Sequence, residues 1–453
     1  MNTPTKTAHS LQAGTAAIAI TPPVGVAMQG YGRRRARGIA DPIFATGLAI
    51  YKDRLEWLLL SVDVIGLDRS FTNRVRRSIA RRLRISPSIV TIICSHTHSG
   101  PATLPRLGVV RGERSYLRFL ESKLVAVAES ATAQFQPVRW RFGMTSLSEN
   151  VNRRLRVGDH IELGVDSAGP VDERVRVVRL DKADGTNVPV ALLVHYACHA
   201  TTSGGVTEIS ADWPGAMRNH VCERYPGNDK PTVLFLQGCT GNLTHRIGRD
   251  TESWPDHFGQ ETTVQSQALG RAVGQAAIQA SEDSKELDAV DVEVGVKPVS
   301  LPFHNRTSVE TSEVQVARIG PGRYLADTRD QAVWFVGLPG EPFTEYSTDF
   351  GREFQRYLGA SPDRTLVCGY TNDCVGYFCT EEALQEGGYE SAGAHRMYHR
   401  PAPFSGSVQS ILRNHCLNAA QDLHLKSPEP LLSWKEVVGH WANRTVAFFR
   451  SER

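Results

Sequence analysis

Long apolar runs are missing from this sequence: no segment approaches the roughly 18–20 apolar residues that a membrane-spanning helix needs. The first residues, MNTPTKTAHSLQAG, also lack the apolar centre of a secretory signal. An excess of one charge is lacking too, because 51 Lys and Arg are balanced by 48 Asp and Glu, which leaves a net charge of +3. These absences argue against stable membrane insertion, secretion and a nucleic-acid partner.

Closely spaced cysteine pairs are absent as well. The eight cysteines contain no CxxC motif and are scattered over positions 94, 198, 222, 239, 368, 374, 379 and 416. In a chain of 453 residues this pattern indicates free thiols and predicts a cytoplasmic location. The sequence also has no Walker A, GxSxG or strand-linked GxGxxG motif, so it offers no P-loop, serine-hydrolase elbow or dinucleotide site.

Apolar strand-like runs alternate with amphipathic helical patterns along most of the chain. We expect strands at residues 58–64, 89–94, 190–194, 233–236, 290–296, 333–336 and 365–367. We expect helices at residues 71–84, 116–135, 264–281 and 343–358. This mixture predicts an α/β or α+β fold, with layered mixed β-sheets flanked by helices. Residues 401–453, which include Pro428 and Pro430, are expected to form a C-terminal extension of uncertain order.

The strongest local signal is SHTHSGP at residues 95–101, directly after an apolar strand. His96 and His98 are two positions apart, so on a strand they would share one face and could converge on one ion or substrate. Imidazole is a common zinc ligand. Two solvated histidines at a polar strand end are the alternative interpretation.

The segment HYACHAT at residues 195–201 also follows an apolar strand. His195 and His199 are four positions apart, so in an extended chain they would lie on one side, and either could be a metal ligand. The alternative for each of them alone is a core histidine whose ring nitrogens are hydrogen-bonded to the backbone.

Three further loops carry polar or catalytic residue types. FLQGCTGN at residues 235–242 could form an anion nest or merely a tight turn. In GLPGEPF, Glu341 stands just before an expected helix that could begin at Pro342. Its carboxylate could complement the helix dipole or bind a metal. GYTNDCVGY at residues 369–377 precedes Tyr389, although single tyrosines are usually packing residues.

Each of these loops follows a separate apolar strand, and ligand sites in α/β sheets collect at strand ends. The same segments, in the same order, resemble the catalytic domain of the neutral/alkaline (non-lysosomal) ceramidase family. The resemblance covers roughly residues 12–400. Its motifs are AGTAAIAITPP at 13–23, SHTHSGP at 95–101, NVNR at 150–153, CHAT at 198–201, FLQGCTGN at 235–242, PGE at 339–341, and GYTNDCVGY followed by GGYE at 369–390.

The resemblance implies a zinc-dependent amidase in which the catalytic domain is an α/β structure of β-sheets flanked by helices. The family's zinc ligands fall on His96, His199, Glu341 and Tyr377. His98 and Arg153 fall on active-site positions, and Tyr389 matches a tyrosine near the scissile carbonyl. Zn²⁺ is therefore the expected cofactor.

Some positions depart from the family pattern. An acid is replaced by Asn242, a serine by Thr244 and a tyrosine by Cys374. The chain is also expected to lack the family's C-terminal immunoglobulin-like domain. We therefore expect a small-molecule N-acyl or amide substrate that is smaller or more polar than ceramide. The arginine clusters at residues 33–37 and 74–84 are interpreted as solvated.

A zinc-bound water is the expected nucleophile, with His98 as the proton carrier. Arg153 and Tyr389 could hold a developing oxyanion or a substrate acid group. Attack by Thr244, or by Cys239 with a nearby histidine, is an alternative mechanism. A non-catalytic binding homologue of the fold is the alternative outside enzymes, and homo-oligomerisation is left open.

Overall fold

The computed structural model describes residues 11–203, 205–225, 227–247, 263–287, 290–321 and 331–425. Across these ranges, none of the helices combines the length and the apolar character that crossing a bilayer would require. All eight cysteines lie in the described ranges and are free, as expected. Residues 426–453 of the expected extension lie outside them.

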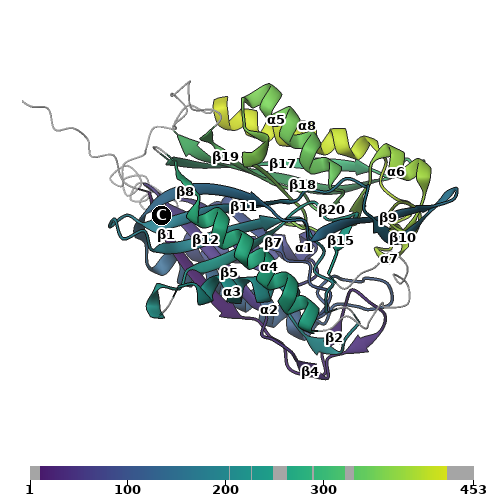
Figure 1. Cartoon of the computed structure of the whole chain (residues 1–453), viewed down its shortest axis with the longest axis horizontal. Helices are drawn as coiled ribbons and strands as arrows, with labels where there is room; N and C mark the ends of the chain where they lie inside the picture. Colours follow the sequence, from purple (N-terminus) through teal and green to yellow (C-terminus); the bar gives the residue numbers. More distant parts are fainter. Residues whose placement is uncertain are drawn as a thin grey trace, which may run out of the picture.

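The larger sheet is mixed and runs through both halves of the sequence (Figure 1). Within the described residues its order is β14-β12-β11-β8-β1-β5-β6-β7, with β16 paired to β8. In chain order the strands are β1 (Gln12–Ala19), β5 (Phe44–Tyr51), β6 (Leu55–Val62), β7 (Val90–Cys94), β8 (Gln136–Ser146), β11 (Arg174–Lys182), β12 (Pro189–Tyr196), β14 (Thr232–Gln237) and β16 (Lys285–Glu286). Strands β6 and β7 are parallel, as are β12 and β14, so their carboxyl ends point the same way within each pair.

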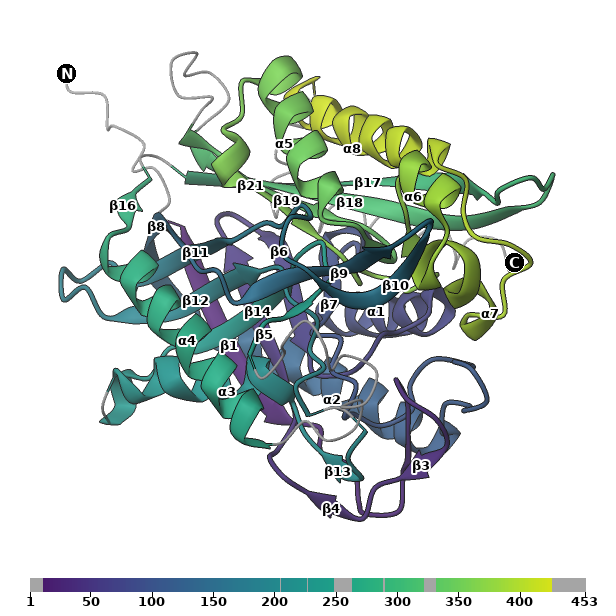
Figure 2. The same cartoon turned by 45° about the vertical axis from the view of Figure 1, so that its right-hand side comes forward.

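The second sheet has the order β17-β18-β19-β21 and packs on the first. Its strands are β17 (Val290–Pro302), β18 (Val309–Pro321), β19 (Val333–Gly337) and β21 (Thr365–Cys368). Trp57 of β6 and Phe335 of β19 meet between the two sheets, with ring centroids 5.7 Å apart. Helices α5 (Glu345–Leu358) and α8 (Ser407–Leu425) cover the outer face of the second sheet (Figure 2).

The remaining long helices cover the larger sheet on its other face. They are α1 (Arg69–Leu83), α2 (Arg114–Ala133), α3 (Asp212–Glu223) and α4 (Thr263–Glu282). Buried side chains on α2, such as Leu120, Leu124 and Val127, recur every three or four residues, which is the spacing that places them on one helical face. The result is helices, two stacked sheets and helices again, which confirms the expected α/β fold with mixed sheets flanked by helices.

Short elements surround the ends of the long strands. The strands among them are β2 (Ala27–Met28), β3 (Arg34–Arg35), β4 (Gly38–Ile39), β9 (Asn150–Val157), β10 (His160–Asp166), β13 (Glu208–Ile209), β15 (Leu243–His245), β20 (Glu341–Pro342) and β22 (Tyr377–Phe378). The helical ones are α6 (Glu381–Glu386), a π-helical turn at Tyr389–Gly393 and α7 (Ala394–Met397). These elements carry much of the site described below.

One helix start differs from the sequence-based expectation. Helix α5 begins at Glu345, and Glu341 and Pro342 instead form the two-residue strand β20. The parallel pairing of Glu341 with Tyr377 and the hydrogen bond from the Glu341 amide to the Gly376 carbonyl (2.9 Å) hold this segment extended. Glu341 is therefore not at the N-terminus of a helix.

The described part of the expected extension begins at residue 401. Helix α8 packs on β17 and β18 and buries Val408, Leu412 and Leu423 in the core beneath α5. This helix therefore shares one hydrophobic core with α5 and the second sheet.

Candidate active site

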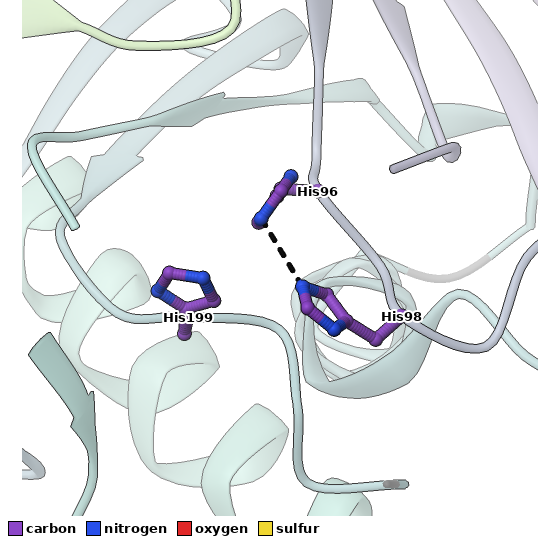
Figure 3. Close-up of side chains that lie close together, drawn as sticks. All are labelled: His96, His98 and His199. Atoms are coloured by element: carbon purple, nitrogen blue, oxygen red, sulfur yellow. Dashed lines mark hydrogen bonds between the residues drawn. The ribbon is translucent and has the colours of Figure 1, made fainter. Parts of the chain in front are cut away.

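Three histidines converge where strands β7 and β12 end (Figure 3). His96 and His98 follow β7, and His199 follows β12. One ring nitrogen from each lies within 4.8 Å of the others. His96 and His199 are 1% and 0% exposed, whereas His98 is half-buried, so the cluster is open to solvent on the His98 side only. Within the described residues, this group of side chains could hold a metal ion.

A turn after β7 brings His96 and His98 to the same site. Their proximity does not result from the alternation of side chains along a strand. Strand β7 ends at Cys94, and His96 has a left-handed φ of 63°, which is unusual for a residue with a side chain. The His96 amide donates to the Val64 carbonyl at 3.1 Å, and the His96 ring stacks on Tyr370 with centroids 4.0 Å apart. The expectation that residues 96 and 98 share one strand face is therefore wrong, although both side chains still reach the same site.

Two of the three rings are oriented by backbone carbonyls. Nδ1 of His96 lies at hydrogen-bond distance from the Ile65 carbonyl, and Nδ1 of His199 lies 2.8 Å from the Thr240 carbonyl. These contacts leave Nε2 of each ring facing the centre. Nε2 of His199 is buried and has no hydrogen-bond partner among the described residues. A buried nitrogen with a free lone pair beside other donors is the arrangement expected of a metal-facing imidazole.

His98 differs from the other two rings. Its Nε2 lies 3.1 Å from Nε2 of His96, but its Nδ1 is buried without a hydrogen-bond partner in the described part of the chain. Burial and the neighbouring rings of His96 and His199 hold the pKa of His98 well below its usual range. The ring of Tyr31 packs edge-on against His98 with centroids 5.3 Å apart.

Glu341 completes the centre from β20. Its Oε2 lies 3.2 Å from Nε2 of His96 and 3.5 Å from Nε2 of His199. Donor atoms of a tetrahedral zinc site are roughly 3.3 Å apart, given Zn–N and Zn–O distances near 2.0–2.1 Å. Burial opposes ionisation of Glu341, but the two histidines outweigh it and hold the pKa of this carboxyl well below its usual range. The donor set therefore fits Zn²⁺.

Two tyrosines that the sequence did not single out hold the Glu341 carboxylate. The Tyr370 hydroxyl donates to Oε2 at 3.1 Å and also lies 2.8 Å from Oγ1 of Thr240. The Tyr398 hydroxyl donates to Oε1. Tyr370 lies inside the GYTNDCVGY motif, so the sequence could have indicated it as a site residue. Tyr398 follows α7 outside any motif, and nothing in the sequence pointed to it.

Arg153 reaches the same region from β9, and its guanidinium is held by hydrogen bonds to three groups. Its Nε donates to Oε1 of Glu390 at 2.8 Å, and its Nη2 donates to the Gly241 carbonyl at 2.7 Å and to the Tyr377 hydroxyl at 3.2 Å. Burial disfavours the Arg153 cation, but Tyr377 and Glu390 raise its pKa above the usual value. Glu390 is a buried partner that sequence reasoning missed, although it belongs to the GGYE motif.

Tyr377 lies on β22, directly beside Glu341 in the parallel register of β20. Burial raises the pKa of its hydroxyl well above the usual range. The Tyr389 ring packs edge-on against Tyr377 with centroids 5.9 Å apart, and burial raises the pKa of Tyr389 to about 12. Within the described residues, neither hydroxyl forms a hydrogen bond with the three histidines.

Thr244 and Asn242 stand on the neighbouring strand and loop. Thr244 is buried on β15, opposite Val151 of β9, and makes no hydrogen bond to the histidines in the described ranges. The Asn242 side chain accepts a bond from the Thr344 amide at 2.8 Å and donates to Glu345 at 2.9 Å. Asn242 therefore holds the start of α5.

His195 and Cys239 lie apart from the centre, in the core. His195 Nε2 lies 3.1 Å from the Val367 carbonyl and Nδ1 lies 3.3 Å from Arg176, so both ring nitrogens are satisfied. Burial lowers the pKa of His195 to about 3. Cys239 Sγ donates to the same Val367 carbonyl, and burial raises its pKa well above the usual value. His195 is thus a core histidine, and the Cys239 thiol is held in its unreactive protonated form.

The fold has known counterparts. The crystal structure of neutral ceramidase from Pseudomonas aeruginosa matches with a TM-score of 0.74 and 16% sequence identity, over 93% of this chain and 75% of that one. A ceramidase complexed with C2 matches with a TM-score of 0.73 and 15% identity, over 94% of this chain and 78% of that one. No protein-family model and no curated protein matches the sequence. The resemblance to neutral ceramidases is confirmed at the level of the fold.

Proposed function

We propose that this chain, with its neutral ceramidase-like fold, is a zinc-dependent hydrolase that cleaves an amide bond of an N-acyl compound. The observation that carries the proposal is the buried convergence of Nε2 of His96, Nε2 of His199 and Oε2 of Glu341. The two solved structures reported above are ceramidases by name, which supports amide hydrolysis. The eight free cysteines support a reducing compartment such as the cytoplasm.

In this proposal His96, His199 and Glu341 hold the ion. Carbonyl contacts fix the Nδ1 atoms of both histidines, and the hydroxyls of Tyr370 and Tyr398 fix the carboxylate. Such outer contacts set the tautomer and orientation of metal ligands. Tyr377, which neighbours Glu341 in the strand register, is the proposed fourth and weaker ligand. A raised pKa makes its phenol a reluctant anion, which suits an exchangeable position.

Zinc, when bound, lowers the pKa of a coordinated water to about 7 and so supplies a nucleophile at neutral pH. His98 is the proposed proton carrier. Its Nε2 faces the centre, while its Nδ1 lacks the carbonyl contact that orients the other two rings. Hydrolysis breaks the C–N bond and one O–H bond of water, and it forms a C–O and an N–H bond. His98 would accept the water proton at Nε2 and pass it to the departing nitrogen.

Arg153 and Tyr389 are the proposed polar groups that face the scissile carbonyl. Glu390 and the Gly241 carbonyl hold the Arg153 guanidinium in place, so its charge is preorganised and needs little rearrangement during the reaction. Tyr389 is 38% exposed and is the more accessible of the two. With a pKa near 12, its hydroxyl stays protonated at neutral pH and can donate to a developing oxyanion.

Two competing mechanisms have less support. Cys239 is buried, its pKa is raised, and its hydrogen bond goes to Val367 in the core. Thr244 lies in the β15 ladder with its side chain 1% exposed, which leaves little access for a bulky acyl group. Attack by water activated in the centre is therefore preferred over a covalent acyl-enzyme.

The test is zinc content together with turnover. We expect about one zinc per chain by elemental analysis, hydrolysis of a panel of N-acyl amides, loss of turnover with a chelator and no effect of thiol alkylation. Stoichiometric zinc without turnover on amides or esters would instead indicate a binding protein with the ceramidase fold.

A further inference from the structure

A cleft of about 950 Å³ is lined in part by Arg34, whose guanidinium donates to the carbonyl of His98. Three short segments form its walls: the segment around β2 and β3, residues 106–113 before α2, and Thr207. Strand β3 lies near the lower edge of the molecule in Figure 2. Its lining is unusually basic, since six arginines and one glutamate face it. The arginines are Arg33, Arg34, Arg35, Arg37, Arg106 and Arg111.

The positive charge of this arginine cleft is largely uncompensated. Oε1 of Glu113 already accepts from Nη1 of Arg35 at 3.2 Å and from the Ala27 amide at 2.9 Å. In the part of the chain that the structure describes, Arg33, Arg37 and Arg111 have no ion pair. Like charges in a concave site repel one another and focus the field, so a bound anion would lower the free energy of the cleft.

The walls of the arginine cleft are preformed. Gln29 is 1% exposed and connects two of them. Its Oε1 accepts from the amides of Thr103 and Leu104 at 2.9 Å, and its Nε2 donates to the carbonyls of Leu104 and Val110 at 3.1 and 3.2 Å. Because the arginines stand on a fixed backbone, less conformational entropy is lost when they bind a ligand.

Arg34 connects the arginine cleft to the histidine centre. Its Nη2 donates to the carbonyls of His98 and Gln29, and its Nη1 donates to the Val206 carbonyl at 2.8 Å. A methyl group built on Gly30, which has a φ of 108°, would lie 2.7 Å from the His98 ring. The arginine loop therefore packs directly against the proposed proton carrier.

The partners of Arg34 are all neutral. Burial lowers its pKa to about 10, and its Nε–H has no hydrogen-bond partner among the described residues. A half-buried guanidinium whose partners are carbonyls and the ring of Tyr31, with the ring centroid 4.9 Å away, lacks an anionic partner in the described ranges. A negative group in the cleft would supply the missing counter-charge.

We propose that the arginine cleft binds an anionic group, a carboxylate or a phosphate, on the amine portion of the substrate. This inference rests on the proposed hydrolase function and narrows its substrate class to acidic N-acyl compounds, such as N-acyl amino acids. We assign the anion to the amine portion because Arg34 of the cleft donates to the His98 carbonyl, and His98 is the proposed carrier of the proton to the departing nitrogen. It also changes the interpretation of residues 33–37, which the sequence alone assigned to a solvated loop.

The shape of the site favours a small anion over an anionic membrane. The arginines line a concavity, whereas a lipid surface is met by side chains that project outward. Guanidinium groups also match carboxylate and phosphate oxygens with paired N–H donors, and several converging forks can enclose one small anion.

The test uses the zinc-loaded, full-length protein and three soluble probes that share an octanoyl chain: N-octanoylglycine, N-octanoylglycinamide and N-octanoylaminoethyl phosphate. We expect kcat/KM to be highest for a charged probe and to fall as salt rises. In an Arg33→Gln/Arg37→Gln variant, KM for the charged probes should rise by about tenfold or more, while the carboxamide should be unaffected. Comparing the carboxylate with the phosphate shows which anion the cleft prefers.

The matched control is Arg77→Gln/Arg81→Gln, which removes two equally exposed arginines from α1. It should leave all three probes unchanged. Calorimetric binding of octyl phosphate to the same variants reports on the cleft even if no amide is hydrolysed, so a failure of the hydrolase proposal is recognised separately. Equal handling of charged and neutral probes by the wild type would overturn the inference. The inference would also be overturned if the Arg33→Gln/Arg37→Gln variant lost binding to phosphatidylglycerol vesicles but still handled the soluble probes as the wild type does. That result would indicate docking to a membrane.

Discussion

Oε2 of Glu341 lies 3.2 Å from Nε2 of His96, although the two residues come from opposite halves of the sequence. The contact is made because β20, which carries Glu341, is held next to β22 by the Glu341–Tyr377 pairing, while a left-handed turn directs His96 inward after β7. Two buried polar atoms at this separation are the nucleus of the proposed metal centre.

The first prediction concerns the ligands of the metal. His96→Ala and His199→Ala should each lose the zinc, because removing one of few strong ligands weakens binding by orders of magnitude. Native mass spectrometry or elemental analysis measures the metal content. The matched control is His195→Gln, since His195 is equally buried but hydrogen-bonded to Val367 and Arg176 in the core. If both alanine variants kept a full complement of zinc, the metal site would have to be formed by other residues.

The second prediction separates His98 from the ligands. His98→Ala should keep its zinc and lose turnover by roughly 10²–10⁴-fold, mainly in kcat, which is the usual contribution of acid–base assistance. The missing carbonyl contact at Nδ1 is the reason for the assignment. Zinc loss in His98→Ala with retention in His96→Ala would show that the two roles are reversed. Activity within a few-fold of wild type would mean that His98 only packs.

The third prediction tests the tyrosines around Glu341. Tyr370→Phe and Tyr398→Phe each remove one hydroxyl that donates to the carboxylate, while the rings remain. Loss of such an outer contact typically weakens metal affinity by about 10–100-fold. Competition with a chelator of known affinity measures the change. The control is Tyr116→Phe, which removes a buried hydroxyl that donates to the Ile20 carbonyl and makes no contact with Glu341, and it should leave zinc affinity unchanged.

The fourth prediction concerns stability and pH. Burial raises the pKa of Asp373 to about 7, against hydrogen bonds from Ser312 and the Cys374 and Arg69 amides. The native state therefore holds this proton more tightly than the unfolded state, so the contribution of Asp373 to stability is highest below its unfolded pKa of about 3.9 and decreases as pH rises towards 7. Asp373→Asn should remove this decrease and gain stability relative to wild type between pH 4.5 and 8, by at most about 4 kcal/mol.

Denaturant unfolding of the metal-free proteins at several pH values measures this difference. Asp172→Asn serves as a control of opposite sign. Burial disfavours the Asp172 carboxylate, but Arg176 and Arg174 outweigh it and hold its pKa below the usual range. Asp172 contributes stability above its unfolded pKa and loses it as pH falls, so its replacement should destabilise the protein most near neutral pH. Parallel pH profiles for Asp373→Asn and wild type would contradict the assignment.

The sequence by itself determined the elements and the chemistry they carry. Apolar runs of five to eight residues form strands such as β7 and β12, and spacing of three to four forms helices such as α2, because these patterns follow from local geometry. The polar loops that follow these strands were also readable, since strand ends in α/β folds face ligand sites. This reasoning made His96, His98, His195, His199 and Glu341 candidates, and the ceramidase resemblance then selected His96, His199 and Glu341 among them.

Only the tertiary structure decided which of these side chains meet. His195 and His199 were equivalent in sequence, but the packing of β12 places His195 against Val367 and turns His199 towards Thr240. Tyr398, which directly follows α7, donates to Glu341 of β20, a contact between distant segments that no local pattern encodes. The arginine cleft likewise exists because Gln29 joins the loop at residues 33–37 to the segment before α2. Such contacts depend on which surfaces the whole chain buries against one another. Periodicity and motif spacing are local properties and do not predict that packing.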